Sequence, residues 1–241
     1  MPAQLSLTNL RLRRSGRDIL NIDQLILNAG EVLAVVGPNG AGKSSLLQVM
    51  AFLIEPDTGH ITLDGEMIGN SNRLAARRKL AMVFQEALLL DTTVEKNIEI
   101  PLRIRGVSRK EAVVRSKEWM NRLGITRLAG QGARNLSGGE AQRTSIARAL
   151  ALKPEILLMD EPFSALDYPT RKSLLVELGD ILRSSGMTTV FVTHDFSEIP
   201  YLTDQVAVLY DGRLIKQGQV VDILGESAVS VKVWAPWDEA L

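Results

Sequence analysis

The chain has 241 residues, of which 45% are hydrophobic and 23% charged, the composition of an ordinary folded domain. Its 28 Lys and Arg balance 28 Asp and Glu, which argues against a general nucleic-acid binder, because such proteins gather an excess of positive charge. The chain contains no cysteine, which excludes a disulfide framework, thiol catalysis and Cys-ligated zinc.

No apolar run approaches the roughly 20 residues needed to cross a bilayer. The longest runs, such as residues 32–36 and 156–159, have the length of a strand. The first residues lack the charged and then apolar order of a secretory signal. We therefore expect a chain that lies in the cytoplasm and does not span the membrane.

The first third of the chain predicts a strand, a loop and a helix. Residues 32–36 form a β-branched apolar run, typical of a strand buried on both faces. A Gly-rich turn follows, and residues 44–52 predict a helix that ends before the turn at 56–59. Asp64-Gly65 predicts a small hairpin after residues 61–63, and residues 80–84 predict another buried strand that Gln85 ends.

The stretch from residue 86 to residue 136 changes character and predicts mostly helix. Thr92 with Glu95, and Ser108 with Glu111, have the spacing of helix-start capping boxes. The second helix places apolar and small residues on one face and reaches a glycine stop at Gly124.

The last part alternates helix and strand, which is typical of a parallel α/β sheet. We expect helices over about 140–152 and 170–183, strands over 156–159 and 188–192, and a hairpin around Asp211-Gly212. The tail over 227–241 carries Trp234 and Trp237; we favour cover of a local apolar surface over a docking site for a partner.

A phosphate-binding pattern stands between the first buried strand and its helix. Residues 37–44 read G-x-x-x-x-G-K-S: Gly37, Pro38, Asn39, Gly40, Ala41, Gly42, Lys43 and Ser44. Backbone amides can surround a phosphate there, Lys43 can reach the terminal phosphates, and the Ser44 hydroxyl can bind Mg²⁺. The pattern indicates a nucleoside triphosphate, but it serves many functions.

Two adjacent carboxylates end the strand over 156–159. Alternation along a strand would point Asp160 and Glu161 to opposite sides. Asp160 could then bind the metal while Glu161 orients and deprotonates an attacking water.

Leu136-Ser137-Gly138-Gly139-Glu140 is the most discriminating segment of the sequence. Ser137 and Glu140 have capping-box spacing, and the two glycines expose bare amides at a helix N-terminus. Without the phosphate-binding pattern, we would favour the interpretation of this segment as simply a well-capped helix.

With these motifs in this order, the chain resembles the ATP-binding cassette (ABC) ATPases over nearly its whole length. Gln85 resembles their Q-loop glutamine, Ser164-Ala165-Leu166-Asp167 their D-loop, and Thr193-His194-Asp195 their switch histidine. The implied fold class is α/β: a P-loop NTPase core with a mostly parallel sheet, an antiparallel β subdomain and an inserted α-helical subdomain. The implied organisation is one ABC domain over 1–241, with the core and β subdomain at 1–85 and 152–226, the helical subdomain and signature at 86–151, and a tail at 227–241.

The resemblance also implies residue roles. ATP is bound by residues 37–44, Ser45 and, from a second cassette packed head to tail, by the signature Ser137, Gly138, Gly139 and Glu140. Asp167 lies at the interface, and the γ-phosphate holds the two cassettes together. Glu161, His194 and Gln85 are the implied catalytic residues, and Ser44, Gln85 and Asp160 the implied Mg²⁺ ligands.

One position departs from the family pattern. Where the family usually stacks an aromatic residue on adenine, this chain has Arg14, flanked by Arg13 and Ser15. A guanidinium plane can stack on a base, so Arg14 is a candidate adenine contact; the alternative is a solvated surface arginine. The basic run Arg73, Arg77, Arg78 and Lys79 could meet lipid headgroups, but we favour a solvated helix face.

The resemblance implies an ATP-hydrolysing subunit of a membrane transporter, peripheral on the inner face of the cell membrane. Its implied partners are a second copy or a homologous cassette, separate integral permease subunits and a solute-binding protein, with no nucleic acid. Import is favoured over export, and segments such as residues 50–56 and 84–90 are most similar to tungstate and molybdate uptake cassettes. The sequence ends soon after Gln217-Gly218, without the regulatory domain of many importers, and truncation stays open.

Two alternatives belong to other classes. A soluble ABC ATPase that acts on nucleic acid or ribosomes usually carries tandem cassettes or long coiled-coil insertions, and neither occurs here. A P-loop kinase would leave the signature segment without a role.

Overall fold

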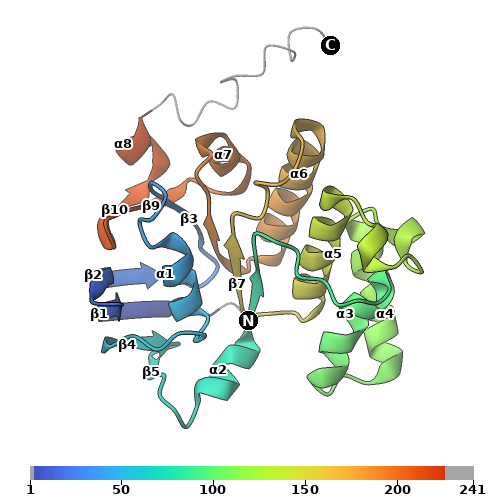
Figure 1. Ribbon diagram of the computed structural model, residues 1–241, viewed down its shortest axis with the longest axis horizontal. Helices are drawn as coiled ribbons and strands as arrows, with labels where there is room; N and C mark the ends of the chain where they lie inside the picture. The colour runs from blue at the N-terminus through green and yellow to red at the C-terminus, as the bar shows by residue number, and fades with distance from the viewer. Residues whose placement is uncertain (1–2, 226–241) are drawn as a thin grey trace, which may run out of the picture.

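The computed structural model describes residues 3–225, whose strands form two sheets (Figure 1). The larger sheet has the strand order β10-β9-β3-β8-β7-β6. Its strands are β3 (Val32–Val36), β6 (Leu80–Val83), β7 (Ile156–Asp160), β8 (Thr188–Val192), β9 (Gln205–Tyr210) and β10 (Arg213–Gln219). All neighbours run parallel except β10, which pairs antiparallel with β9.

The smaller sheet is antiparallel, in the order β2-β1-β4-β5. Its strands are β1 (Leu5–Arg14), β2 (Arg17–Leu27), β4 (Thr58–Leu63) and β5 (Glu66–Met67). Leu5 and Leu7, and after an irregularity at Asn9 also Leu10 and Leu12, are buried, because one face of β1 packs on the core and the other meets solvent. The two long strands β1 and β2 thus take up most of the chain before β3.

Helices cover the larger sheet and form a separate subdomain (Figure 1). They are α1 (Lys43–Met50), α2 (Arg73–Lys79), α3 (Val94–Ile104), α4 (Arg109–Arg122), α5 (Gly138–Ala151), α6 (Tyr168–Ser185), α7 (Ile199–Leu202) and α8 (Val220–Leu224). α3, α4 and α5 pack on one another, with buried side chains such as Ile98, Met120 and Ile146 between them.

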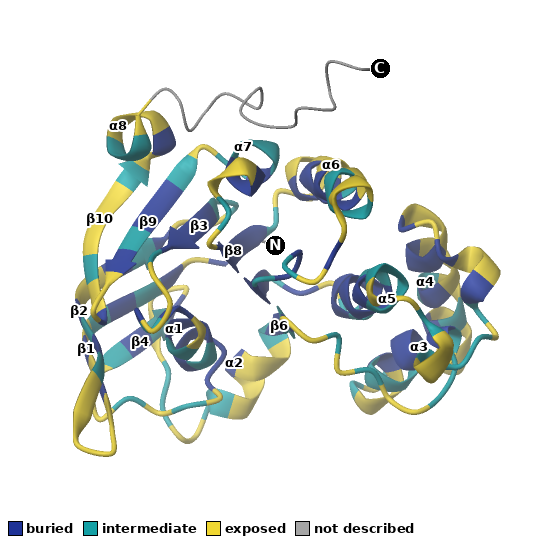
Figure 2. Cartoon of the chain, turned by 45° about the horizontal axis from the view of Figure 1, so that its top comes forward, coloured by how far each residue is buried: buried dark blue, intermediate teal, exposed yellow. Residues whose placement is uncertain are grey.

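The buried residues form two clusters, one on each face of the larger sheet. One joins both sheets through α1, with Leu33, Leu46 and Leu158 among its members. The other joins the sheet to α5, α6 and α7, and includes Phe163, Leu178 and Phe191. Figure 2 shows dark, buried residues on the strands and on the inward faces of the helices. The predicted fold class is confirmed: a mostly parallel sheet, an antiparallel β subdomain and an inserted helical subdomain.

Helix starts agree only in part with the predicted capping boxes. The box at Ser137 and Glu140 is present. The N-cap of α3 is Thr93, whose side chain accepts from the Lys96 amide, so the predicted Thr92–Glu95 box is wrong by one residue. Ser108 caps α4, but the Glu111 carboxylate pairs with Arg115 one turn later, so half of that box is formed.

The remaining elements lie close to their predicted places. α6 begins at Tyr168 rather than near residue 170, because Asp167 is its N-cap and a proline stands in its first turn. The hairpin turns at Asp64-Gly65 and Asp211-Gly212 both have positive φ at each residue, as two-residue hairpin turns require. The tail with Trp234 and Trp237 lies outside the described residues.

Candidate functional site

Four segments that follow neighbouring parallel strands meet at one edge of the larger sheet. β3 leads into residues 37–44, β6 into Gln85, β7 into Glu161 and β8 into His194. The strands run parallel in the order β3-β8-β7-β6, so their carboxyl ends lie at the same edge. The crevice at the carboxyl ends of such strands is where open α/β sheets bind ligands.

The loop from Gly37 to Gly42 presents backbone amides at the start of α1. The N-cap is Gly42 at φ 96°, with no side chain to occupy the first amides of the helix, so these remain available to an anion. A Cβ on Gly42 would lie 2.7 Å from the Ile19 carbonyl oxygen, and one on Gly37 2.0 Å from that of Leu209. Glycine is therefore required where this loop passes the neighbouring backbone.

Lys43 and Ser44 begin α1 beside the loop. The Lys43 Nζ donates to the carbonyls of Gly37 and Pro38, at 2.9 and 3.1 Å, and thus spans the loop. The Ser44 hydroxyl donates to Asp160 Oδ1 at 3.1 Å, which joins the start of α1 to the end of β7. The structure thus brings together these three residues predicted from the sequence.

Asp160 is buried at the end of β7. Burial raises the pKa of its carboxyl, and the Ser44 hydroxyl partly opposes that effect. No group of three or more His, Cys, Asp or Glu side chains within residues 3–225 could hold a metal alone. A hydroxyl and a carboxylate beside a phosphate loop are oxygen ligands that suit Mg²⁺ when phosphate oxygens complete the shell.

Glu161 does not continue the strand. Its φ is +42°, in the left-handed region, and β7 ends at Asp160. The prediction that strand alternation points the side chains of Asp160 and Glu161 to opposite sides is therefore wrong in its reason, because a turn sets the direction of Glu161. The amide of Glu161 donates to the Val192 carbonyl at 3.0 Å, which ties the turn to the end of β8. The turn places Glu161 Oε2 at 2.9 Å from His194 Nδ1. Non-glycine residues with positive φ concentrate at functional sites, because other contacts must hold them there.

Gln85 lies two residues after β6 and contacts the same segment. Its Nε2 donates to Ser164 Oγ at 3.3 Å, and that hydroxyl donates to the Glu161 carbonyl at 3.0 Å. Ser164, which the sequence places in the D-loop, therefore bridges Gln85 to Glu161. The structure brings Gln85, Glu161 and His194 to one edge of the sheet.

The signature segment forms a second potential anion site at the start of α5. The Ser137 amide donates to Glu140 Oε2 at 3.0 Å, and the Glu140 amide donates to Ser137 Oγ at 3.3 Å. Hydrogen bonds from the Ser137 amide and the Ser137 hydroxyl to the Glu140 carboxylate hold the pKa of Glu140 below its usual value. The two bonds of the capping box use the amides of Ser137 and Glu140. The amides of Gly138 and Gly139 between them have no intrahelical acceptor. Neither glycine has a side chain of its own that could shield its amide.

A hollow of about 660 Å³ lies beside the signature. It is lined by all four signature residues and by Ala165, Leu166 and Asp167 of the D-loop. Gly139 permits this arrangement, because a Cβ there would lie 2.7 Å from Thr170 Cγ2. The residues of the phosphate loop do not line the hollow. Figure 1 shows α1 and α5, which follow the two anion sites, on different sides of β7.

Asp167, at the edge of this hollow, caps α6. Its carboxylate accepts from the Thr170 amide at 2.9 Å. Hydrogen bonds from the Thr170 hydroxyl and from this amide lower the pKa of the Asp167 carboxyl. Asp167 is exposed, so its side chain can be reached from outside the chain.

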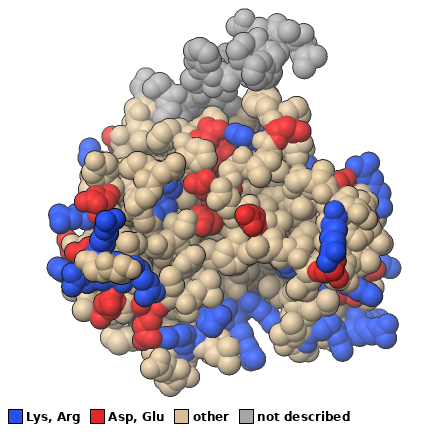
Figure 3. All heavy atoms as spheres, viewed as in Figure 1, with Lys and Arg blue, Asp and Glu red and all other residues tan. Residues whose placement is uncertain are grey.

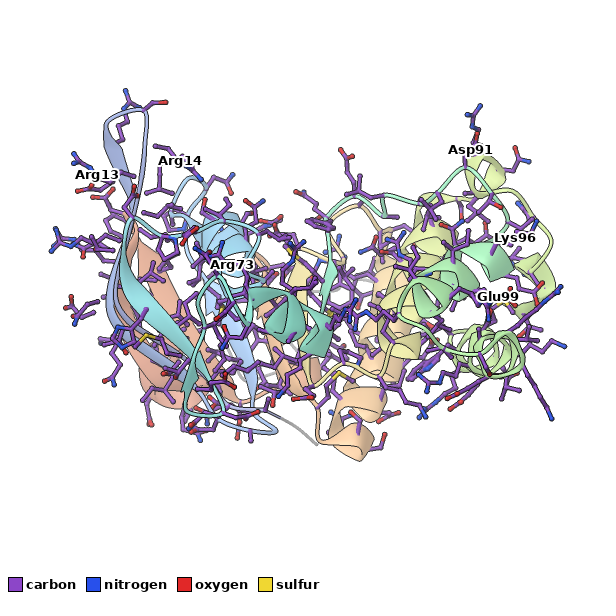
Figure 4. The ribbon with its side chains drawn as sticks, turned by 90° about the horizontal axis from the view of Figure 1, so that it is seen from below. Arg13, Arg14, Arg73, Asp91, Lys96 and Glu99 are labelled. Carbon is purple, nitrogen blue, oxygen red and sulfur yellow. The ribbon has the colours of Figure 1, made fainter. Side chains whose placement is uncertain are left out.

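Arg14 lies at the end of β1, next to the turn formed by Ser15 and Gly16. Its neighbour Arg13 is paired with Asp18 at 2.9 Å, whereas Arg14 is exposed and has no polar partner within the described residues. Figure 4 shows both arginines beside the β1–β2 hairpin, at the end of the molecule opposite Asp91, Lys96 and Glu99 of the helical subdomain. Arg14 is free to meet a base; its role stays a prediction.

The basic run on α2 is only partly solvated. Arg73, which Figure 4 shows on α2, pairs with Glu55 at 2.8 Å, and Lys79 pairs with Asp64 and Glu155 at 3.4 and 3.3 Å. Arg77 and Arg78 are exposed. In Figure 3, Lys and Arg gather along the lower edge of the molecule, over α2 and the adjoining helical subdomain.

Glu198 is a buried carboxyl that sequence reasoning missed. It is 3% exposed and accepts from the Thr193 hydroxyl at 2.6 Å, one residue from His194. Burial raises its pKa to about 7, the Thr193 hydroxyl partly opposes this, and Asp195 adds to it. No local pattern marks the residue, since its burial depends on how the segment after β8 packs.

We predict that Glu198→Gln stabilises the protein more at pH 8 than at pH 5. The folded-state pKa lies above the unfolded value, so the free energy of unfolding of the wild type falls as pH rises from about 4.5 to about 7. Glutamine stays neutral, so the stability difference between variant and wild type should grow by about 2 kcal/mol between pH 5 and pH 8. Urea titrations at both pH values measure it, with the exposed Glu86→Gln as control; equal differences at both pH values would refute the assignment.

A sequence model described as "ABC transporter" matches residues 20–164. Three curated relatives are named as import ATP-binding proteins. The phosphate protein PstB 2 of Natronomonas pharaonis is 40% identical over 84% of this chain, the methionine protein MetN of Carboxydothermus hydrogenoformans 39% over 89%, and the molybdate/tungstate protein WtpC of Thermococcus kodakarensis 42% over 83%. The chain spans 75%, 66% and 60% of their lengths.

Two solved structures share the fold closely. The cbiO1 protein of Clostridium perfringens, described as part of an ABC transporter complex cbiONQ, has a TM-score of 0.85 at 28% identity, covering 93% of this chain and 92% of its own. The dimeric cassette MJ0796, bound to ADP and Pi, has a TM-score of 0.81 at 30% identity, covering 90% of this chain and 98% of its own.

Within residues 3–225, no helix has both the length and the apolarity to cross a bilayer.

Proposed function

We propose that this chain, which belongs to the ABC transporter family, is the ATP-hydrolysing subunit of an importer and works as a dimer of cassettes. One observation carries the proposal. The carboxyl ends of adjacent strands bring a phosphate loop, a hydroxyl–carboxylate pair and a carboxylate–imidazole pair together, while two bare glycine amides lie apart beside the D-loop. The first group suits phosphate chemistry, and the second suits binding of a phosphate held by another cassette.

Residues 37–45 bind the triphosphate in this proposal. The loop amides and the N-terminus of α1 supply donors and positive potential, and Lys43 exchanges its carbonyl contacts for the terminal phosphates. Ser44, Asp160 and Gln85 are the side chains that would hold Mg²⁺. The bound Mg²⁺ would neutralise charge on the phosphate oxygens.

Glu161 acts as the general base in the proposed reaction. Its carboxylate faces the end of the sheet and contacts His194, so an attacking water can be held between the base and the phosphate. His194, 57% exposed, is placed to turn toward the γ-phosphate. Gln85 is tied to the Glu161 backbone through Ser164, which links the base to the segment that enters the helical subdomain.

The signature amides bind the nucleotide of a second cassette. The hollow that contains Gly138 and Gly139 contains no residue of the phosphate loop, so a complete site needs both surfaces from different copies. The related cassette MJ0796 was solved as a dimer with ADP and Pi, which supports this arrangement. Asp167 would lie at the interface. A homologous cassette could replace the second copy.

A groove of about 420 Å³ is our candidate for permease docking. It lies between the core and the helical subdomain, and its lining includes Leu53, Leu90 and Ile104, which are 45%, 44% and 77% exposed. Three arginines, Arg77, Arg105 and Arg148, also line it. An exposed apolar groove with a basic rim suits an amphipathic segment of an integral membrane subunit. Docking there would place the chain at the inner face of the membrane.

The relatives support import but not one solute. Those named for phosphate, methionine and molybdate/tungstate have nearly equal identity to this chain, between 39% and 42%. We retain an oxyanion such as molybdate or tungstate as the proposed solute class. The solute would be selected by the permease and a solute-binding protein.

Copurification from detergent-solubilised membranes tests this proposal. The tagged chain should recover integral permease subunits, and mass spectrometry would identify them. Ile104→Asp should reduce the recovery, because it places a charge on the exposed wall of the groove. Val114→Asp is the matched control, since Val114 is 59% exposed on α4 outside the groove. A chain that recovers no integral subunit, or an Ile104→Asp variant that recovers them fully, would contradict it.

We predict that Arg14→Ala weakens ATP binding about fivefold, because a stacked guanidinium contributes about 1 kcal/mol. Arg14→Tyr should restore the affinity, and Arg13→Ala should leave it unchanged, since Arg13 is held by Asp18. Inorganic tripolyphosphate should bind equally to wild type and Arg14→Ala, because it has no base. Titration calorimetry measures the ATP affinities of the wild type and the three variants, and the tripolyphosphate affinities of the wild type and Arg14→Ala. Equal ATP affinity for Arg14→Ala and wild type would show that Arg14 is only a surface residue.

A further inference from the structure

Arg171 connects two segments of the site that are far apart in sequence. It lies in the first turn of α6, four residues after the helix cap Asp167. Its Nη2 donates to the Leu166 carbonyl of the D-loop at 3.0 Å, and its Nη1 pairs with Asp195 Oδ2 at 2.9 Å. The guanidinium thus holds the D-loop with one nitrogen and the segment after β8 with the other.

Asp195 in turn fixes the backbone that carries His194. Its Oδ1 accepts from the amide and hydroxyl of Ser197, at 3.0 and 2.6 Å. Its own amide donates to the Thr193 hydroxyl at 3.0 Å. His194 lies between Thr193 and Asp195 in the chain, and its Nδ1 is 2.9 Å from the Glu161 carboxylate. A shift of Asp195 must therefore move the imidazole.

The guanidinium has little freedom. The side chain is 27% exposed, and its Nε is buried with no hydrogen-bond partner within the described residues. Leaving a buried donor unsatisfied costs free energy, so the two Nη contacts must outweigh that cost to hold this geometry. A lysine could keep one contact but not both, because it lacks the planar fork.

We propose that Arg171 is a positioning residue that couples the D-loop to His194 and thereby aligns the imidazole with Glu161. The proposal deepens the hydrolysis proposed above, since the D-loop lies beside the signature, on the surface that the second cassette would cover. A displacement of the D-loop by that cassette would pass through Leu166 and Arg171 to Asp195. Arg171 would thus report dimer closure to the catalytic histidine.

The structure offers a matched control on the same helix. Arg183, in the last turn of α6, also donates to a backbone carbonyl, that of Tyr201 at 3.0 Å, and pairs with a carboxylate, Asp180 at 2.8 Å. Its contacts involve neither the D-loop nor residues 193–197, because Tyr201 lies farther along the chain, on α7. Arg183→Ala thus removes a similar set of bonds without touching the proposed connection.

Steady-state ATPase assays of the full chain test the coupling. Arg171→Ala should lower kcat about tenfold to a hundredfold with little change in KM, because ATP is bound elsewhere and only alignment is lost. Arg171→Lys should recover the thermal stability of the wild type but not its kcat, since the ion pair with Asp195 can persist without the D-loop contact. Arg183→Ala should keep the wild-type kcat. If Arg171→Lys restores kcat and stability together, or Arg171→Ala matches Arg183→Ala, Arg171 is a structural residue and the inference is wrong.

A spectroscopic measurement separates this inference from the proposed function. The chain has two histidines, so nitrogen-15 labelling of histidine gives two imidazole spectra. Arg171→Ala should shift the His194 signals and leave those of His60, on β4, unchanged. Unchanged His194 signals would overturn the inference. A wild-type protein that hydrolyses no ATP would overturn the proposed function instead, and the spectra would still show whether Arg171 positions His194.

Discussion

Glu161→Gln is expected to lower kcat for ATP hydrolysis on the order of a thousandfold, the effect of removing a positioned general base, while ATP affinity stays at the wild-type level. Glutamine keeps the size of the side chain and can still contact His194, but it cannot accept the proton of the attacking water. In the proposed site ATP is bound by residues 37–45, so ATP binding should be spared. Single-turnover assays and equilibrium titration with a fluorescent ATP analogue measure the two quantities.

The same variant should accumulate as a dimer in the presence of ATP. If the γ-phosphate is bound by the signature amides of a second copy, blocking hydrolysis preserves those contacts. Glu155→Gln is the matched control, because Glu155 directly precedes the opposite end of β7, away from the site, where it pairs with Lys79. A Glu161→Gln variant that hydrolyses ATP at the wild-type rate would remove Glu161 from the role of base.

The strands and the phosphate loop could be predicted because their signals are local. A strand covered on both faces is apolar along most of its length: β3 is apolar at every position, and β7 is apolar from Ile156 to Met159. The phosphate loop needs glycines at fixed spacing, and the signature capping box needs two residues three apart. The parallel order of the sheet then brings the loops together without further information.

Contacts between segments could not be predicted from local patterns. Arg171 and Asp195 are 24 residues apart, and their pairing depends on how α6 packs beside the end of β8. The burial of Glu198 has the same origin. The positive φ of Glu161 follows from the hydrogen bond of its amide to Val192, which alternation along a strand does not predict. The cap of α3 at Thr93 rather than Thr92 shows that adjacent candidate caps are separated only by tertiary contacts, such as the bridge between Thr93 and Gly132.

Two single variants, Lys43→Ala and Ser137→Asp, should each lose ATPase activity when tested alone. Lys43→Ala removes the side chain that we propose binds the terminal phosphates. Ser137→Asp places a carboxylate beside the signature amides, where it repels phosphate, while aspartate remains a good helix N-cap. Each homodimer then carries the same defect in both of its sites, so ATP hydrolysis should fall to background in both preparations.

Mixing these two variants is the most direct test of a nucleotide site shared between copies. In a mixed dimer, the intact phosphate loop of the Ser137→Asp chain faces the intact signature of the Lys43→Ala chain. Circular dichroism should first establish that each variant is folded. An equal mixture should then regain about a quarter of the wild-type ATPase rate, because half of the dimers are mixed and each contains one intact site of two. Two folded variants whose mixture stays at background, or a Ser137→Asp chain that hydrolyses ATP alone at the wild-type rate, would contradict the shared site.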